Sequence, residues 1–350
     1  MFRFVLRKMI SKKWMILALL IGNILLMSIT AANAMYGKAV LQRTLTRNLG
    51  ETLTEENVHP GTITIQAGST AARNHLIYQT SGIVDNIPET FGIPEELTVK
   101  QIFVGPTAMK TEMDSEESMG TLIQLGYMSN LEDHIELVAG RLYEKTPDAD
   151  GVVDIMVSER GMVSLRLVLD QVVTVPRLTD ANGEPLRLRV CGIFRNSSDE
   201  EAYWVRSPGV YKQECFVPEA VFTQLFSKEF SEVKMSGQFD VLLDYTAMQA
   251  QQASYYLKAT GQYSEFFSQL PGHSYEDTFS QVLTDYAQTA PKVEVTLWVL
   301  QIPVFMLLAA FIFMVSQKML EMERDEIAVL KSRGASKKQI LLTYLLQSGI

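Results

Sequence analysis

Two long apolar runs limit what this chain can fold into more than any other feature of its sequence. Residues 14–36 and 295–315 contain no Asp, Glu, Lys or Arg, and the runs are 23 and 21 residues long. A helix needs about 20 apolar residues to cross the hydrocarbon core of a bilayer. We therefore predict transmembrane helices at residues 14–36 and 293–315, the second of which includes the two residues before its uncharged run.

The charges that flank these runs predict how the chain crosses the membrane. Residues 1–13 hold five basic and no acidic residues, residues 316–338 hold six basic and four acidic residues, and residues 37–292 hold 20 basic and 35 acidic residues. Lys and Arg near the ends of a span favour the cytoplasmic side. We therefore expect a multi-pass protein of the cell membrane with a cytoplasmic N-terminus and an extracytoplasmic region at residues 37–292. The acidic balance of this region argues against nucleic acid as a partner.

The start of the chain allows two interpretations. Residues 1–13, MFRFVLRKMISKK, mix bulky apolar and basic residues, which is typical of a cytoplasmic amphipathic helix in contact with membrane lipid. A basic start, an apolar run and Ala32-Asn33-Ala34 also fit a cleavable signal peptide. We favour a retained span because the run is long for a signal peptide and pairs naturally with the second span.

The region between the two spans has the pattern of a mixed α/β domain. Alternation of apolar and polar residues predicts strands at residues 61–66, 97–105, 135–141, 153–160, 171–178, 185–194, 214–218 and 239–245. Asn182-Gly183 predicts a hairpin turn. Helical patterns cover residues 113–131, 218–226, 248–270 and a stalk from 274 into the second span, with a kink at Pro291. The predicted fold class is an α+β membrane protein with a large mixed α/β extracytoplasmic domain inserted between its first two transmembrane helices.

Two cysteines, Cys191 and Cys215, lie in the region predicted to be extracytoplasmic. A disulfide between them is compatible with that location but is not required by it. Alternation in LRLRVCGIF places Cys191 on the same face as Arg187 and Arg189, which predicts an accessible thiol. A free structural cysteine is the interpretation that we favour.

A short, densely charged segment follows the second span. Its sequence, EMERDEIAVLKSRGASKKQI, covers residues 321–340. We expect a helix that ends near Arg333, with Gly334 as the left-handed residue that closes it. Ser336 and Gln339 have the spacing of a capping box for a new helix. Residues 316–338 are therefore predicted to form a cytoplasmic helix and turn, and residues 339–350 the start of a third span.

The charged segment resembles a segment of a known family. EMERDEIAVLKSRGASKKQILLTYLL is similar to the part that follows the second transmembrane helix in FtsX-like ABC transporter permeases, of the MacB and LolC/LolE kind (type VII). The family pattern is a charged helix with Glu-Ile, an apolar pair, a basic residue and then Gly-Ala-Ser with further basic residues. The order of an amphipathic helix, one span and a large outer domain is also that of the family. Residues 135–175 and the pieces RVCGIF and ECFVPEAVF resemble its MacB-like periplasmic core domain.

The resemblance implies a permease subunit that couples ATP hydrolysis by a separate cytoplasmic ABC ATPase to the outer domain. The implied cargo for export or extraction is a lipoprotein, lipid, peptide or toxin. It further implies a second permease copy or a paralogue, an extracytoplasmic partner, and four spans, so that this chain would end inside the third. The residues implied to couple to the ATPase are Glu326, Ile327, Leu330, Lys331, Arg333, Gly334, Ala335, Ser336, Lys337 and Lys338.

The sequence offers no pattern for catalysis or for nucleotide binding. It has no G-x-x-x-x-G-K-[ST] motif, so we expect ATP and Mg²⁺ to be used by the partner ATPase and no cofactor to be bound by this chain. It has no G-x-S-x-G motif. The four histidines do not have the spacing of a metal site: His59, His75, His134 and His273. We therefore expect a non-catalytic transmembrane subunit without a metal.

Three other functions stay open at this point. A two-span receptor with a ligand-binding outer domain should continue into a long heptad-patterned helix, whereas this chain returns to apolar sequence after the charged segment. A regulator of cell-wall hydrolases would share the permease architecture and differ in its outer partner. A membrane-anchored binding or enzyme domain would leave the Gly-Ala-Ser corner unexplained.

Overall fold

A computed structural model describes residues 13–56, 58–69, 73–111, 118–180, 182–198, 201–204, 211–226, 233–332, 334 and 336. The chain divides into two compact units, which are treated separately below. The first comprises residues 1–44 and 286–350, and the second comprises residues 45–285. The predicted amphipathic helix at residues 1–12 and the predicted third span at residues 339–350 lie outside the described residues.

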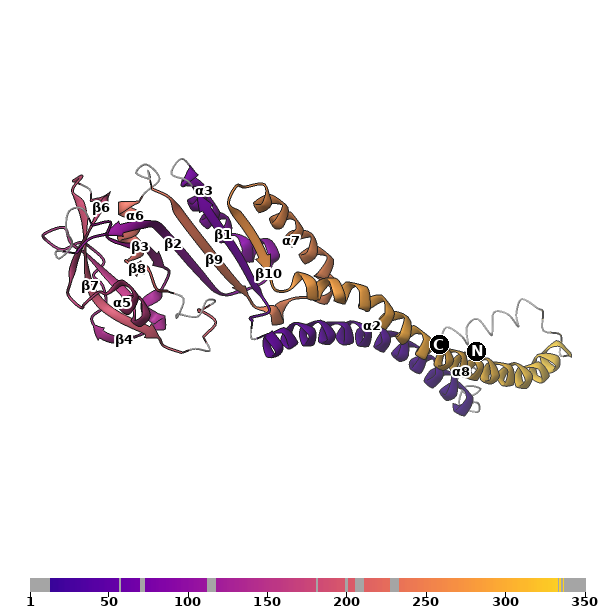
Figure 1. Cartoon of the computed structure of the whole chain (residues 1–350). Helices are drawn as coiled ribbons and strands as arrows, with labels where there is room; N and C mark the ends of the chain where they lie inside the picture. The colour runs from indigo at the N-terminus through magenta and orange to yellow at the C-terminus, as the bar shows by residue number, and fades with distance from the viewer. Residues whose placement is uncertain are drawn as a thin grey trace. The chain divides into compact units, whose positions relative to one another are not determined.

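The second unit is built on one sheet, in which the described strands are ten and follow the order β10-β1-β9-β2-β3-β8-β5-β7-β4, with β6 also paired to β7 (Figure 1). Their bounds are β1 Thr62–Ser69, β2 Glu95–Met109, β3 Thr121–Met128, β4 Ile135–Gly140, β5 Val153–Ser158, β6 Val172–Thr179, β7 Pro185–Asn196, β8 Glu214–Phe216, β9 Met235–Leu243 and β10 His273–Asp277. The predicted mixed α/β domain is therefore present, and most of its strands were anticipated from alternation.

The sheet has two halves that differ in strand direction. We call β10, β1, β9 and β2 the proximal half, and every pair among these strands is antiparallel. We call β3, β8, β5, β7, β4 and β6 the distal half, and it contains the parallel pairs β3/β8 and β5/β7. The two halves meet where β2 pairs with β3.

A kink in β2 marks the meeting point of the halves. The register between β2 and β3 shifts between Val104 and Thr107. Gly105 has a φ of 124°, and a Cβ at this position would lie 2.9 Å from the carbonyl oxygen of Ile123. Because only glycine fits both constraints, Gly105 allows β2 to continue through the bulge and serve both halves.

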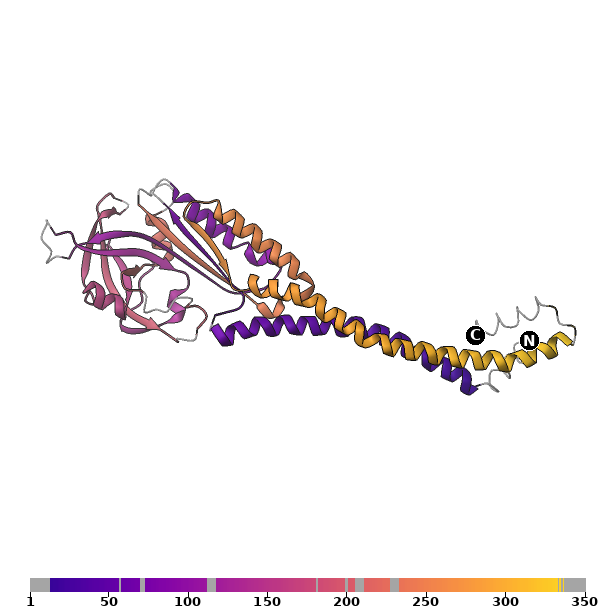
Figure 2. The same cartoon turned by 45° about the vertical axis from the view of Figure 1, so that its right-hand side comes forward.

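Helices cover the proximal half on one face (Figure 2). They are α3 His75–Val84, α4 Ile87–Phe91 and α7 Ala253–Ser268; α3 packs on β1 and β9, and α7 packs on β10. The aromatic ring of Phe91 stacks on Tyr256 and Tyr263 and meets Phe279 edge-on. This apolar packing holds α4 against α7 and against Phe279, which lies just before the start of α8.

The distal half has its own apolar core of aromatic side chains. Phe216 on β8 lies edge-on to Phe103, Phe194 and Tyr211. Two short helices belong to this half, α5 Glu159–Leu165 next to β5 and β7, and α6 Glu219–Leu225 next to β3. Ser158 caps α5 by accepting a hydrogen bond from the Gly161 amide.

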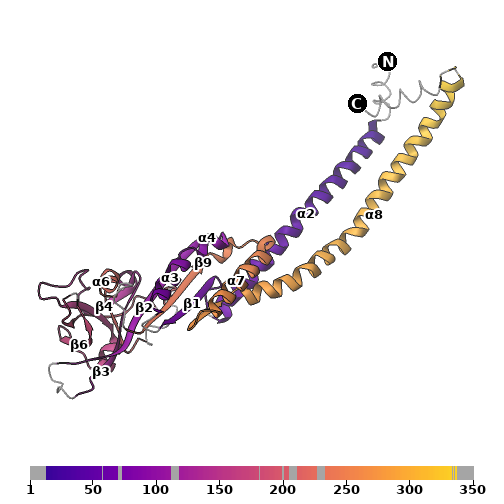
Figure 3. The ribbon, with the colours of Figure 1, turned by 90° about the horizontal axis from the view of Figure 1, so that it is seen from above.

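The first unit consists, in its described part, of two long helices that run in opposite directions (Figure 3). They are α2, Lys13–Glu56, and α8, Ser280–Ser332, whose ends extend into the second unit. A Cβ on Gly22 of α2 would lie 3.3 Å from Phe311 and Ile312 of α8, and a Cβ on Gly37 would lie 3.7 Å from Leu297. Each helix contains a stretch that is long and apolar enough to cross a membrane, Leu20–Leu53 and Ser280–Lys318.

Two expectations from the sequence were wrong, and the favoured interpretation of Cys191 was confirmed. Residues 121–128 form the strand β3 and not part of the predicted helix. Most side chains at the end of this strand are buried, so it lacks the alternation of apolar and polar residues by which a strand is recognised. The predicted stalk begins with β10, and the helix starts only at Ser280. Cys191 is a buried free cysteine, as we favoured, and is 1% exposed; a register shift between β5 and β7 makes it the extra residue of a bulge, and its Sγ lies against the Ile155 carbonyl oxygen.

The disulfide that the sequence allowed is not formed. Both cysteines are free and buried. Cys191 lies on β7 and Cys215 on β8, and β5 lies between these strands. Two strand spacings separate Cα atoms by about 9–10 Å, which is beyond the reach of a disulfide. Burial also raises the pKa of each thiol to about 12, so neither ionises near neutral pH.

Candidate coupling site

The charged segment at the end of α8 is the candidate coupling site. Helix α8 continues from the apolar stretch through Lys318 and Glu321 to Ser332. Lys318 Nζ lies 2.9 Å from Glu321 Oε2, one turn along the helix. The segment is therefore a direct helical extension of the predicted second span, with no break between the two.

The turn after α8 agrees with the sequence prediction. Gly334 has a φ of 85°, and its amide donates a hydrogen bond to the Lys331 carbonyl oxygen over 3.2 Å. Ser332 Oγ donates to the Val329 carbonyl oxygen over 2.8 Å. Carbonyls that lack helical donors at the end of the helix are thus satisfied locally, and the left-handed glycine turns the chain away from the helix axis.

The structure describes only some of the predicted coupling residues. Glu326, Ile327, Leu330 and Lys331 lie on α8. Ile327 is partly buried, whereas Val329 is 52% exposed, so part of the predicted apolar edge faces outward. Ser336 is exposed. The remaining predicted residues, Arg333, Ala335, Lys337 and Lys338, lie outside the described residues, as does Gln339 of the predicted capping box.

Apolar side chains stand on the exposed faces of α8 between its two ends. Met306, Leu307 and Phe313 are each about two thirds or more exposed within the described chain, at 68%, 72% and 66%. A helix that is apolar on all its faces is typical of a core helix or a membrane span. The least exposed positions follow one face at steps of three or four residues, Leu297, Gln301, Phe305, Leu308 and Ile312, and this face includes the contacts with α2.

The other end of α8 is anchored in the proximal half. Asp277 Oδ1 accepts hydrogen bonds from the amides of Phe279, over 3.2 Å, and Ser280, over 2.6 Å, and so caps the helix. Phe279 and Leu283 are fully buried. One continuous helix thus runs from a capped, buried end in the second unit to the charged end.

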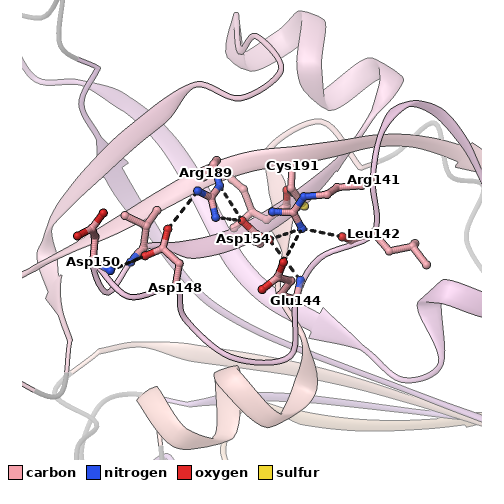
Figure 4. A network of polar contacts seen from close by, with 10 residues as sticks. Arg141, Leu142, Glu144, Asp148, Asp150, Asp154, Arg189 and Cys191 are labelled. Atoms are coloured by element: carbon pink, nitrogen blue, oxygen red, sulfur yellow. Dashed lines mark hydrogen bonds and ion pairs between the residues drawn. The ribbon is translucent and has the colours of Figure 1, made fainter.

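The distal half contains a network of charged groups that sequence reasoning missed (Figure 4). Asp154 on β5, whose side chain is 2% exposed, accepts hydrogen bonds from Arg141 Nη1 at 2.6 Å and Arg189 Nη2 at 2.8 Å. Arg189 Nη1 also lies 3.1 Å from Asp148 Oδ2, and Asp148 Oδ1 accepts hydrogen bonds from two backbone amides of its own loop. The network fixes the loop between β4 and β5.

The electrostatics of the network are set by the two guanidinium groups. Burial raises the pKa of the Asp154 carboxyl, but the hydrogen bonds from Arg141 and Arg189 outweigh it and hold this pKa below its usual value. The pKa of Asp148 is also lowered, first by the hydrogen bond from the Val152 amide. The signal in the sequence was an acid inside the apolar strand VVDIMV, close to arginines in the strand LRLRV. Among the described residues, no group of three or more His, Cys, Asp and Glu side chains could hold a metal ion.

Comparison with known proteins gives matches to solved structures alone. No protein-family model matches the chain, and no curated protein matches it. The chain is similar to the periplasmic region of MacB from Actinobacillus actinomycetemcomitans, with 12% identity, a TM-score of 0.35, and coverage of 67% of this chain and 95% of that chain. It is also similar to a domain of a protein described as a permease from Porphyromonas gingivalis, with 13% identity, a TM-score of 0.29, and coverage of 61% and 86%. At these TM-scores the matches do not decide what this chain does.

Proposed function

We propose that this chain is part of a permease subunit of an ABC transporter, in which a separate ATPase drives motion of the outer domain through α8. The observation that carries the proposal is the continuity of α8, which runs for 53 residues from its buried, capped start to the charged end. At about 1.5 Å per residue such a helix extends roughly 80 Å, more than twice the thickness of a bilayer core. A helix of this length can join a sheet on one side of a membrane to a docking site on the other.

Two further features support the proposal. The apolar faces of α8 and α2 fit lipid, which would place the second unit outside the cytoplasm and the charged end inside it. The left-handed turn at Gly334 presents the end of α8 in one defined conformation. Under the proposal Glu326, Ile327, Leu330 and Lys331 contact the ATPase, and ATP and Mg²⁺ are bound by that partner and not by this chain.

The place where cargo would be acted on depends on which part of the chain the ATPase moves. A chain that moves its outer domain need not carry cargo through its spans. We therefore propose that a lipoprotein, lipid, peptide or toxin is acted on outside the membrane, with a second permease copy or a paralogue completing the assembly.

Affinity purification from detergent extracts tests the proposal. The full-length protein is compared with a Glu326→Lys, Gly334→Pro double variant and with Glu294→Lys, a matched charge reversal at the other end of the apolar part of α8. We expect an ATPase to be retained by the wild type and by Glu294→Lys and to be lost from the double variant, because proline cannot adopt the positive φ of Gly334. An ATPase in none of the three samples would contradict the proposal and favour the two-span receptor.

A further inference from the structure

The segments that lead out of α2 and into α8 are tied together at one edge of the proximal half. Residues 58–62 connect α2 to β1, and Asp277–Ser280 connect β10 to α8. All four strands of the proximal half have an end here, since β1 starts at Thr62, β10 ends at Asp277, β9 ends at Leu243 and β2 starts at Glu95. The chain therefore connects both long helices to the sheet at this edge.

Three residues make the tie, and we call His59, Thr62 and Thr278 the clamp. The carbonyl oxygen of His59 accepts hydrogen bonds from Thr62 Oγ1 at 2.9 Å and from Thr278 Oγ1 at 3.0 Å. Thr278 Oγ1 also accepts from the Thr62 amide at 3.1 Å, and the Thr278 amide donates to the Thr62 carbonyl oxygen at 3.1 Å. The Thr278 hydroxyl thus joins the two connecting segments across 216 residues of sequence.

The clamp is also held to the other two strands. His59 Nε2 lies 2.9 Å from Glu96 Oε2 on β2, and the His59 ring meets the ring of Tyr245 edge-on just after β9. Gly61 lies against β9, where a Cβ would come within 2.0 Å of the Leu243 carbonyl oxygen and the Leu243 amide donates to the Gly61 carbonyl oxygen at 2.9 Å. The connection after α2 therefore has no room to shift relative to β9.

This arrangement is more than local turn chemistry needs. Asp277 already caps α8, and the Thr62 amide already has the His59 carbonyl oxygen as an acceptor at 3.2 Å. The Thr278 hydroxyl adds side-chain links to the backbone bond between the Thr278 amide and the Thr62 carbonyl oxygen, which continues the pairing of β1 with β10. Thr62 is 5% exposed, so little water can replace these bonds if they break.

We propose that the clamp makes the base of both helices and the four strand ends move as one body, and that Thr278 is the positioning residue that passes helix motion to the sheet. The inference rests on the proposed function, because it concerns motion that the ATPase drives. Without the Thr278 hydroxyl, the connecting segments would absorb the displacement of α8 and the strands would not follow.

Hydrogen exchange of the full-length permease with its co-purifying ATPase in lipid nanodiscs tests the inference, with and without ATP and vanadate. Thr278→Val removes the hydroxyl and keeps the side-chain shape. Thr284→Val is the matched control, because Thr284 Oγ1 bonds only one turn back to the Ser280 carbonyl oxygen in the contacts the structure describes. We expect ATP to change exchange in α8 and in β1, β9 and β2 of the wild type and of Thr284→Val. In Thr278→Val the change in α8 remains and the change in the strands is lost.

Two further variants keep the result decisive. Thr278→Ser retains the hydroxyl and should restore the response of the strands, which a general loss of stability would not do. Thr62→Val removes one of the bonds to the His59 carbonyl oxygen and should reduce the response, so it replaces Thr278→Val if that variant does not accumulate.

A strand response that persists in Thr278→Val overturns the inference, and so does a wild type whose α8 responds while its strands do not. A wild type in which α8 itself does not respond to ATP contradicts the proposed function, and the inference falls with it.

Discussion

The two halves of the sheet bury an aspartate in different ways. In the distal half, Asp154 on β5 is held by the guanidinium groups of Arg141 and Arg189. In the proximal half, Asp240 on β9 is fully buried and accepts hydrogen bonds from the Thr64 hydroxyl at 2.6 Å and the Gln238 amide at 2.8 Å. The donors to the distal aspartate are thus two guanidinium groups, whereas the donors to Asp240 are a neutral hydroxyl and a neutral amide.

This difference has a consequence for how each half responds to its surroundings. Charge-assisted hydrogen bonds are strong, but they depend on the ionisation of the acid. A neutral hydroxyl or amide donor attracts a carboxylate less strongly than a guanidinium group does. The lowered pKa values of Asp154 and Asp148 therefore predict that the distal network responds to acid.

The largest effects should come from the aromatic cores of the two halves. Phe216→Ala in the distal half and Phe279→Ala in the proximal half should each lower the free energy of unfolding by about 3–5 kcal/mol, because each leaves a cavity beside an aromatic ring that packs edge-on against it. Chemical denaturation of the full chain in detergent measures the loss. Hydrogen exchange should show faster opening in the half that carries the change, and equal acceleration in both halves would show that they do not open separately.

The next largest expected effect is the difference in stability between variants of Asp154 and Asp240. Asp154→Asn should lower the free energy of unfolding by roughly 2–3 kcal/mol, because two arginines lose their charged acceptor and the new amide group sits at a side-chain position that is 2% exposed. Asp240→Asn should cost less, because the Thr64 hydroxyl can donate or accept. Denaturation midpoints of the two variants, measured at neutral pH, make the comparison. A larger loss in Asp240→Asn would reverse our view of the two halves.

The pH dependence of stability sharpens the same comparison. The pKa values of Asp154 and Asp148 are lower in the folded chain than their usual value of 3.8. These carboxyls therefore stabilise the fold at pH values above 3.8, and their contribution is lost as the pH falls through the lowered values. We expect exchange in β5 and β7 to rise below about pH 4, before exchange in β1 and β9. In Asp154→Asn this acid-induced step should become smaller.

The smallest effect concerns an ion pair on the edge of the distal half. Glu136 on β4 and Arg195 on β7 lie 2.9 Å apart, and both side chains are more than half exposed, at 57% and 54%. Glu136→Gln should change the free energy of unfolding by no more than about 0.5 kcal/mol, and less in high salt. Thermal denaturation at two salt concentrations measures it. A loss as large as that of Asp154→Asn would show that burial is not what distinguishes the network.

Some of this architecture could be predicted from the sequence and some could not. The two apolar helices, the hairpin at Gly183 and the left-handed Gly334 follow from local rules of composition and φ, and they were anticipated. β3 was missed because both of its faces are buried, which removes the alternation that marks a strand. The clamp was missed because Thr62 and Thr278 meet only through the order of strands in the sheet, and neither residue has a local signal.

The candidate site shows the same limit. The charged segment was recognised because its residues are contiguous and resemble a family pattern. Its connection to the second unit depends on where α8 begins, and we placed that start too early because Ser274–Asp277 has the local pattern of a helix. The tertiary pairing of β10 with β1 overrides that local preference.

The kinked strand β2 decides how the sheet bears load. β2 pairs with β9 from Glu95 to Val104 and with β3 from Gln101 to Met109, so the two pairings overlap over only a few residues. A force along β2 would load many of the hydrogen bonds to its neighbouring strands at the same time. A force across β2 would instead break these hydrogen bonds one after another. The sheet of the second unit should therefore be stiff against a force along β2 and compliant to a force across it.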